Sequence, residues 1–469
     1  MIMRLDQMNA WQDLGAPFFS LSNSLWALVP LEAWRRGLRV TLQPSARYTL
    51  SDGNSTFSFR QTRLTGSQAD ALAHLCDDKQ GTREVLLKAG LPAPQGALFT
   101  DHINKAELAD YAESLGFPVC IKPNNWAKAR GVFPKVGNRD AVLAALDMLV
   151  DDLGAREIVV EQHIPGDTLR VFVAGGKVVG ATWAEAANVT GDGANSIATL
   201  IEIKAERRRQ NPHMKSSPLV LDAAMKDFLD AQGLSPESVP AEGVTVTLRA
   251  ASNLAQGGDS LDVTDEISQR VAEVAIASLA AVPGLRHAGI DLLVDDFRSE
   301  AAEVYVNELN PSAGLGGHIY PGAGGRRDVA AAIVDQYFPG TRAKDEAKYW
   351  YFSLNQITRL FTSRVASEVV LEPLPLIEQP HWRTLRFEGS AGSQVQLLRN
   401  ELLSRVTRGS LHGRIGPVRS GSFDLAIVGT AQQVKRAEAM ARDLAGQRQC
   451  TMKPVSSRPF RTTAGFIAG

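Results

Sequence analysis

The chain has 469 residues, enough for two to four domains with hydrophobic cores of their own. Its 50 basic and 51 acidic residues leave a formal charge of −1, which gives no electrostatic reason to expect nucleic acid or an anionic membrane as the main partner. Three widely spaced cysteines, Cys76, Cys120 and Cys450, indicate neither a disulfide framework nor a zinc site. The apolar stretch 18–31 is too short to span a bilayer, so we expect a cytoplasmic protein.

Residues 1–77 are expected to form a small N-terminal α/β region. The apolar run around 26–34 is typical of a helix that is broken or kinked at Pro30. A β-hairpin is predicted over 48–59, with Asp52-Gly53 at its turn.

Residues 78–342 alternate helices and strands. Helices are predicted from Lys79 to Gly90 and over 105–115, and a strand is predicted to end at Lys122. Both lysines would point into a loop, where a mobile ammonium group suits the oxygens of a triphosphate. Taken singly, each lysine is more simply a solvated surface charge.

The apolar strand that ends at Glu161 leads into an extended hinge, Gln162-His-Ile-Pro-Gly166. Backbone N–H and C=O groups of such a hinge, around Ile164, could meet the edge of an adenine, and Asp167 could meet a ribose. An ordinary exit from strand to turn is the alternative.

A polar, basic excursion covers roughly residues 185–240, and an excursion of that length inside a compact domain is uncommon and usually functional. It is either a solvated basic loop or a lid that brings Arg207 or Arg208 over a site. The strand 244–249 follows and ends at Arg249, whose guanidinium could stabilise charge on a transferring phosphoryl group or could simply be solvated.

Two apolar strands, 289–294 and 304–310, predict a second hairpin that folds about residues 299 and 300. This register places Asp291 opposite Glu308, with Asn310 on the same face. Two carboxylates that close repel each other unless a cation lies between them, and hard oxygen ligands suit Mg²⁺. A solvated hairpin with scattered acids is the alternative.

After a charged linker, 344–348, residues 349–469 include a β-α-β-β-α-β pattern over about 383–455, which is the ferredoxin-like order. The pattern also resembles acylphosphatase. Leu397 and Pro417 stand where that family carries its arginine and asparagine, so a packing, dimerisation or gating role is expected rather than hydrolysis.

The whole central block resembles an ATP-grasp carboxylate–amine ligase, most closely the ATP-grasp module of cyanophycin synthetases. The matching stretches, in family order, are Leu115-Gly-Phe-Pro-Val-Cys-Ile-Lys-Pro123, Val160-Glu-Gln-His-Ile-Pro-Gly166 with Arg170-Val, Val189-Thr-Gly-Asp-Gly193, Leu248-Arg249 with Asn253-Leu, Asp262-Val-Thr-Asp265, Ala288-Gly-Ile-Asp291 and Glu308-Leu-Asn310 through His318 to Arg327-Asp328-Val329. The resemblance implies an α+β protein in which two lobes grip ATP.

It also implies a set of site residues. ATP would contact Lys79, Lys122, Glu161, Gln162, Ile164 and Asp167; one or two Mg²⁺, or Mn²⁺ in its place, would bind Asp291, Glu308 and Asn310; Arg249, Lys122 and Arg170 would be catalytic; and Asn253, Gly257, Gly258, Gly314 and His318, with Arg207 and Arg208 of the lid, would line the substrate.

The chain departs from the family pattern on the substrate side. Trp126 and Ala129 replace two glycines of the phosphate cover, and Gly316 replaces an arginine. The substrate of a named relative is therefore not carried over.

The expected function is an ATP-dependent, ADP-forming carboxylate–amine ligase that forms an amide or peptide bond through an acyl phosphate, with an amino acid or small peptide as substrate. A carboxylate kinase and a non-catalytic nucleotide-binding regulator remain as alternatives. The expected partners are small-molecule acids and amines, and a homodimer is left open.

Overall fold

The computed structural model describes residues 24–100, 103–126, 130–250, 252, 254–374, 377, 379–406, 411–460, 462–463 and 466–468. The chain divides into two compact units, 1–28 with 57–339 and 29–56 with 340–469. The block boundaries that the sequence suggests, near 77 and 342, stay predictions.

The first unit contains a four-stranded sheet in the order β5-β8-β6-β7, and two helices pack on its apolar face. Its elements are β5 (Gly96–Phe99), α4 (Lys105–Leu115), β6 (Val119–Pro123), β7 (Phe133–Val136), α5 (Arg139–Leu146), η4 (Asp147–Asp152) and β8 (Ile158–Gln162). The predicted helix 105–115 is confirmed, since Asn104 caps its first turn by accepting from the N–H of Ala106.

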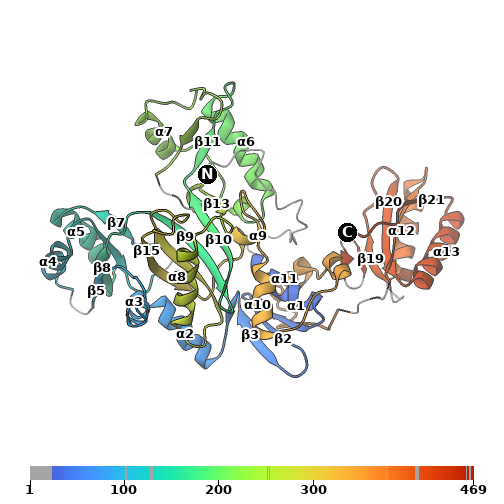
Figure 1. Ribbon diagram of the computed structural model, residues 1–469. Coiled ribbons are helices and arrows are strands. Elements are labelled where there is room, and N and C mark those ends of the chain that lie inside the picture. The colour runs from blue at the N-terminus through green and yellow to red at the C-terminus, as the bar shows by residue number, and fades with distance from the viewer. Residues whose placement is uncertain are drawn as a thin grey trace. The chain divides into compact units, whose positions relative to one another are not determined.

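A second sheet of the same unit has five antiparallel strands in the order β13-β10-β9-β14-β15 (Figure 1). The strands are β9 (Asp167–Ala174), β10 (Lys177–Glu185), β13 (Asp259–Asp262), β14 (His287–Val294) and β15 (Val304–Asn310). Helix α8 (Gln269–Ala280) packs its buried residues against the apolar side chains of one face. The other face therefore carries the alternate, more polar residues.

The predicted basic loop over 185–240 is wrong, because this excursion folds into a small helical insertion with its own core. It consists of β11 (Asn188–Thr190), α6 (Ile197–Gln210), η5 (Met214–Ser216) and α7 (Ala223–Asp230), and β12 (Thr245–Thr247) pairs with β11. Figure 1 shows α6, α7 and β11 gathered together. The predicted strand 244–249 is thus shorter and stops before Arg249.

Buried charge holds this insertion to the large sheet. The carboxylate of Asp259 pairs with Lys204 Nζ at 2.6 Å and with Arg208 Nη1 at 2.5 Å, and all three side chains are at most 3% exposed. We call these three residues the Asp259 network.

The remaining elements of the first unit lie around these sheets. They are η3 (Leu25–Ala27), β3 (Thr56–Arg60), β4 (Arg63–Leu64), α2 (Ser67–Asp77), α3 (Lys79–Lys88), η6 (Leu254–Gln256), α9 (Gly316–Ile319) and α10 (Val329–Tyr337). Helix α3 begins at Lys79 as predicted, with Asp78 as its N-cap.

The second unit joins an early hairpin to the C-terminal part of the chain. Strands β1 (Arg39–Gln43), β2 (Arg47–Ser51) and β17 (Val369–Leu371) form antiparallel pairs. Helix α1 (Leu28–Arg35) runs through Pro30 without the predicted break, since a proline in the first turn loses no intrahelical hydrogen bond. Short elements follow, η7 (Asp345–Tyr349), β16 (Trp350–Tyr351) and α11 (Leu354–Thr362).

The rest of this unit has the predicted alternation of strands and helices. It comprises β18 (His381–Glu388), α12 (Gly392–Val406), β19 (His412–Ile415), β20 (Ser422–Gly429), α13 (Ala431–Gln447), β21 (Thr451–Ser456), β22 (Thr462–Thr463) and β23 (Phe466–Ala468). The sheet order is β21-β18-β20-β19-β23, and apolar residues of both helices fill the core beneath it.

Within the described ranges, every helix is too short or too polar to cross a lipid bilayer.

Candidate functional site

A row of polar side chains crosses the five-stranded sheet on the face opposite α8. The strand registers place Asp262, Thr182, Arg170, Asp291 and Glu308 directly opposite one another, one from each strand. Directly paired residues project from the same face of a sheet. The row therefore gathers charge on one surface from segments far apart in the sequence.

The end of this row contains the three residues predicted to bind metal, Asp291, Glu308 and Asn310, which we call the carboxylate cluster. The predicted register is confirmed, since Asp291 pairs with Glu308 across β14 and β15. Asn310 Nδ2 donates to Glu308 Oε1 at 2.9 Å and to Asp291 Oδ2 at 3.2 Å. The three polar groups thus converge.

The pKa values of the two carboxyl groups are shifted in opposite directions. Burial raises the pKa of Asp291 to about 6, although Arg170 acts in the opposite direction. Burial also acts to raise the pKa of Glu308, but hydrogen bonds with Asp291 and Asn310 outweigh it and hold the pKa below its usual value. The pKa of Asp291 is thus raised and that of Glu308 lowered, so of the two carboxyl groups Asp291 takes up a proton more readily.

Arg170 supplies positive charge to the cluster from the adjacent strand β9. Its Nη2 lies 2.7 Å from Asp291 Oδ2, and its Nε also donates to the same carboxylate. Gly289 leaves room for this arginine, because a Cβ there would lie 3.0 Å from Arg170 Cδ. The sequence flagged Arg170 only through the family resemblance, since the contact depends on the pairing of β9 with β14.

The two predicted phosphate-binding lysines come from different elements, Lys122 from β6 of the four-stranded sheet and Lys79 from the start of α3. Lys122 Nζ pairs with Glu161 Oε1 at 2.5 Å and donates to Asn307 Oδ1 on β15 at 3.1 Å, so it bridges the two sheets. Burial acts to lower the pKa of Lys122, but Glu161 outweighs it and the pKa is raised. The lysine is therefore charged and held close to the hairpin.

Lys79 reaches the loop that follows β6. Its Nζ donates to the carbonyl oxygens of Asn124 at 3.0 Å and Trp126 at 2.7 Å. Burial lowers its pKa, while Glu308 acts to raise it, so Lys79 lies within electrostatic reach of the carboxylate cluster. Ala129, the other altered position of the predicted phosphate cover, lies outside the described residues.

In the hinge 162–166, two backbone N–H groups that were predicted to meet adenine already have hydrogen-bond partners. The N–H of Gln162 donates to the carbonyl of Gln95, and the N–H of His163 donates to that of Pro118. These two N–H groups are therefore already bonded to backbone. Ile164 is buried and Asp167 is exposed, and their predicted contacts with adenine and ribose stay predictions.

Arg208 and Arg249 are bound to acidic side chains in this structure, away from their predicted roles at the site. Arg208 is 1% exposed and belongs to the Asp259 network, so it is not available as a lid residue over a substrate. Arg249 pairs with Asp222, the N-cap of α7. A role for Arg249 at a phosphoryl group requires an exchange of that partner. Arg207 lies in the last turn of α6, and its role stays a prediction.

The predicted acceptor side consists of glycine-rich backbone and His318. Gly257 has a φ of +90°, and a Cβ there would meet Leu219 Cδ1 at 2.7 Å, so both conformation and space call for glycine. Gly258 offers its carbonyl to Arg208, and a Cβ on Gly314 would meet open space. Asn253 lies outside the described residues.

The carboxylate cluster fits a divalent cation. Within the described ranges, no group of three or more His, Cys, Asp or Glu is placed to hold a metal, so any such ion here must take ligands from elsewhere. Two carboxylates with an amide beside them are the oxygen donors that Mg²⁺ accepts together with substrate phosphates. A cation between the carboxylates would offset their mutual repulsion.

Two residues of the polar row, Thr182 and Asp262, were given no role at the site by the sequence analysis. Asp262 is 4% exposed and accepts from Arg327 Nη2 at 2.7 Å, so its charge is already paired. The pattern Asp262-Val-Thr-Asp265 was noted as a family motif, but the row becomes visible only once the sheet order is known.

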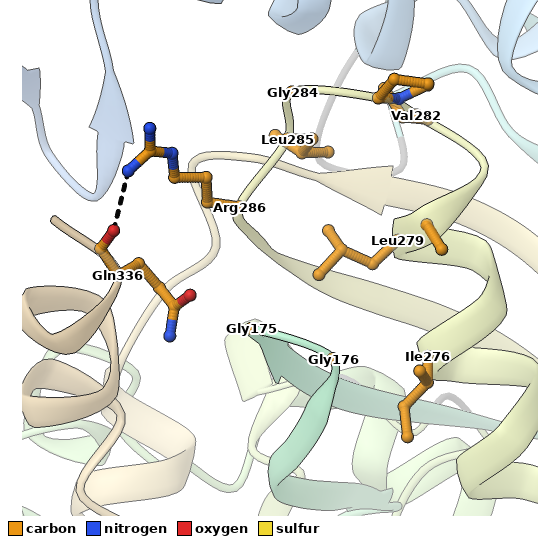
Figure 2. A pocket seen from close by; sticks show the side chains of 11 residues that line it. Gly175, Gly176, Ile276, Leu279, Val282, Gly284, Leu285, Arg286 and Gln336 are labelled. Carbon is orange, nitrogen blue, oxygen red and sulfur yellow. Dashed lines mark hydrogen bonds between the residues drawn. The ribbon is translucent and has the colours of Figure 1, made fainter. Parts of the chain in front are cut away.

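A cavity of about 330 Å³ lies at the far end of the same sheet. It is lined by the β9–β10 turn, the end of α8, the loop after it and Gln336, whose carbonyl accepts from Arg286 Nη1 at 2.8 Å (Figure 2). The cavity is lined by Arg286, the residue before β14 begins at His287. At the usual rise of a strand, His287 and Asp291 are about 13 Å apart. The cavity is therefore separate from the carboxylate cluster.

Comparison with known proteins gives the chain relatives. It is 33% identical over 302 residues to a cyanophycin synthetase from Synechocystis sp., across 63% of this chain and 34% of the relative. It is 29% identical over 316 residues to the glutathione biosynthesis bifunctional protein GshAB of Clostridium perfringens, across 66% of this chain and 40% of that protein. The chain thus spans about a third of the length of the cyanophycin synthetases it matches. No model of a protein family matches it.

Among solved structures, the bifunctional glutathione synthetase from Pasteurella multocida superposes with a TM-score of 0.50 at 26% identity. The superposition covers 64% of this chain and 41% of that one. The fold is therefore a mixed α+β fold of the ATP-grasp kind. By these likenesses the chain is similar to the cyanophycin synthetases over its central part, in agreement with the resemblance to the ATP-grasp module of those ligases that the sequence predicts.

Proposed function

We propose that the chain is an ATP-dependent carboxylate–amine ligase that forms an amide or peptide bond and releases ADP and phosphate. The observation that carries the proposal is the carboxylate cluster on the β14–β15 hairpin, flanked by Arg170 and within reach of Lys79 and Lys122. The proposed acid is an amino acid or a small peptide. Similarity to ligases named for cyanophycin and glutathione supports this substrate class.

In the proposed reaction, a substrate carboxylate oxygen attacks the γ-phosphorus of ATP, ADP leaves, and an acyl phosphate forms. An amine then attacks the acyl carbon, phosphate leaves with the bonding electron pair, and the nitrogen loses a proton. No protein nucleophile is needed. Most of the rate enhancement would come from positioning and from neutralising the phosphate charge.

The described residues suit the first step. Lys79 and Lys122 would hold phosphate oxygens, and Arg170 would lie beside the acceptor carboxylate. The cluster of Asp291, Glu308 and Asn310 would hold one or two Mg²⁺, or Mn²⁺ in their place, and the metal when bound would neutralise charge on the β- and γ-phosphates. Arg249 would join the site after leaving Asp222. Glu161 and the hinge around Ile164 would hold the adenine, with Asp167 near the ribose.

The proposal is tested by incubating the full chain with ATP, Mg²⁺ and pools of amino acids, with and without hydroxylamine. A ligase releases ADP and gives a hydroxamate, since hydroxylamine traps the acyl phosphate. ADP release without hydroxamate would indicate a kinase, and nucleotide binding without ADP release would indicate a regulatory protein.

For the C-terminal part, we propose a ferredoxin-like domain of the acylphosphatase type that packs or dimerises rather than hydrolyses. Its element order and sheet order support this assignment, while Leu397 and Pro417 stand in place of the catalytic residues. Sedimentation of the full chain at several concentrations tests for the homodimer. Free cysteines at 76, 120 and 450 support a cytoplasmic location.

A further inference from the structure

Residues 208–217, which form the end of α6 and the turn after it, are fixed to the segments before β13 and after α9. One anchor is Arg208, which donates from Nη1 to the carbonyl of Gly258 at 2.9 Å and from Nη2 to that of Ser217 at 3.0 Å. Because Arg208 is almost fully buried, these bonds are shielded from water and hold the stretch against β13.

The second anchor is Asn211, whose side chain is fully buried. Its Nδ2 donates to the carbonyl oxygens of Tyr320 and Pro321, at 3.2 and 3.3 Å. Its Oδ1 accepts from the backbone N–H of His213 at 2.8 Å. The backbone that carries His213 is therefore fixed to the segment that follows α9.

His213 packs directly on the glycines at the start of α9. A Cβ on Gly316 would overlap with the imidazole of His213, and a Cβ on Gly317 would lie 2.6 Å from Ser260 Oγ. Gly316 does not have a positive φ, so glycine is required there by space and not by backbone conformation. The insertion thus places the imidazole of His213 against Gly316 and Gly317, where α9 has no side chain.

The neighbouring His318 is a buried polar side chain that lacks a hydrogen-bond partner. It is 1% exposed, and among the described residues neither Nδ1 nor Nε2 has a partner. Its ring meets Phe172 edge to face at 5.7 Å, and Gly180 leaves room for it, since a Cβ there would lie 2.9 Å from Nδ1. Buried polar groups are nearly always satisfied, so this imidazole is available to a hydrogen-bonding group of a ligand.

We propose that His213 and His318 bind the attacking amine, and that His213 is the residue that determines which amine is accepted. The proposal rests on the proposed function, whose acceptor side it specifies. The ligand class is a primary amine in its uncharged form, which can donate its N–H groups to imidazole nitrogens.

The electrostatic surroundings favour an uncharged amine. Burial lowers the pKa of His213 to about 4, with Arg208 acting in the same direction. Burial lowers the pKa of His318 to about 3, helped by Arg170. Surroundings that disfavour an imidazolium also disfavour an ammonium ion, and only the uncharged amine has the lone pair that attacks an acyl carbon. An amine with a second, cationic group near this site would be rejected for the same reason.

The test replaces His213 by alanine in the full chain and measures KM for each amino acid of a panel as the amine, together with KM for ATP. KM for the preferred amine is expected to rise about tenfold, because roughly one hydrogen bond to the amine is lost. The order of preference among the amines is also expected to change. KM for ATP is expected to change by less than about twofold. His381→Ala, at an exposed histidine of the second unit, is the matched control.

A double-mutant cycle separates this role from a merely structural one. Gly316→Ala should raise KM for the amine as His213→Ala does, because the added methyl group displaces the imidazole. In the His213→Ala background the same substitution should have a smaller effect, since of the two close contacts only the one with Leu25 Cδ1, at 2.8 Å, then remains. Equal rises in both KM values, or an unchanged amine preference in His213→Ala, would overturn the proposal.

A wild-type chain that gives neither ADP nor hydroxamate would refute the proposed function, and amine binding would then be measured without turnover. The amino acid panel would be screened by thermal shift in the presence of a non-hydrolysable ATP analogue. Stabilisation of the wild type but not of His213→Ala upholds the amine site. Equal stabilisation of both proteins, or of neither, overturns it.

Discussion

The carboxylate cluster and the Asp259 network are both buried groups of acids and bases in the first unit, but their charges balance in opposite ways. In the cluster two carboxylates lie beside a single arginine, and burial raises the pKa of one of them. In the network a single carboxylate receives two cations. The cluster has less positive than negative charge and is suited to bind a cation. In the network the carboxylate is already paired with two cations, and these pairs hold the insertion to the large sheet.

This contrast shows why burial of charge does not by itself mark a functional site. Both regions consist of buried acidic and basic residues, and only the ion pairs that these residues form distinguish one region from the other. A buried pair that is broken by removing one partner is costly to stability, whereas a site that lacks a cation is costly only to the reaction. Substitutions in the two regions should therefore separate activity from stability.

The largest effect is expected for Glu308→Gln, which removes one charge from the carboxylate cluster. Turnover should fall by roughly 10³-fold, since charge neutralisation at the transferred phosphoryl group is lost, while the fold is kept. ADP release measures the rate and circular dichroism the fold. Glu303→Gln, on the exposed turn of the same hairpin, should keep its activity. Full activity of Glu308→Gln would remove the metal assignment.

Asp259→Ala should act on stability. It leaves Lys204 and Arg208 buried without their carboxylate, and breaking a buried ion pair typically costs about 3–5 kcal/mol. Hydrogen exchange of α6 amides measures the free energy of opening of the insertion. Glu206→Gln, in an exposed pair with Arg209, is the control and should leave that free energy nearly unchanged. Equal protection of α6 in both variants would show that the network does not hold the insertion.

A smaller loss of turnover is expected for Arg249→Ala, about 10²-fold, if the arginine leaves Asp222 to stabilise the phosphoryl group. Asp222→Asn keeps the cap on α7 but removes the competing charge, so its turnover should not fall. A matched loss in both variants would mean that the Arg249–Asp222 pair matters only as a structural contact.

The smallest effect concerns pH. The folded pKa of Asp291, about 6, lies above its ordinary value of 3.8, so the folded state binds the proton more tightly and metal-free stability falls as pH rises between these values. A cation must displace this proton. Mn²⁺ affinity, measured by calorimetry with an ATP analogue, should therefore rise by up to about tenfold per pH unit below pH 6 and level off above it. Asp291→Asn should abolish this dependence, and a flat profile in the wild type would contradict the raised pKa of Asp291.

The sequence was sufficient to predict strand pairing and helix bounds wherever local periodicity decides them. The pairing of Asp291 with Glu308 was predicted from alternation along two consecutive strands, although the register shifts by one residue between Asp291 and Leu292. The bounds of α4 follow from its cap and the glycine beyond it. Both are contacts between neighbours in the chain.

The sequence was insufficient where partners come from distant segments. Arg170 meets Asp291 only because β9 pairs with β14, and Arg208 is buried only because Asp259 lies against the end of α6. Before the fold is known, a run such as Arg207-Arg208-Arg209 has the composition of a solvated loop. For the same reason His213 carried no signal, since its role depends on missing side chains at Gly316 and Gly317.

The most direct test of the central claim is an anomalous difference map from crystals grown with Mn²⁺ and a non-hydrolysable ATP analogue. The account predicts a metal peak about 2.2 Å from carboxylate oxygens of Asp291 and Glu308, shared with phosphate oxygens of the nucleotide. A nucleotide bound with its metal elsewhere, and with Arg170 still the only cation at these carboxylates, would contradict it.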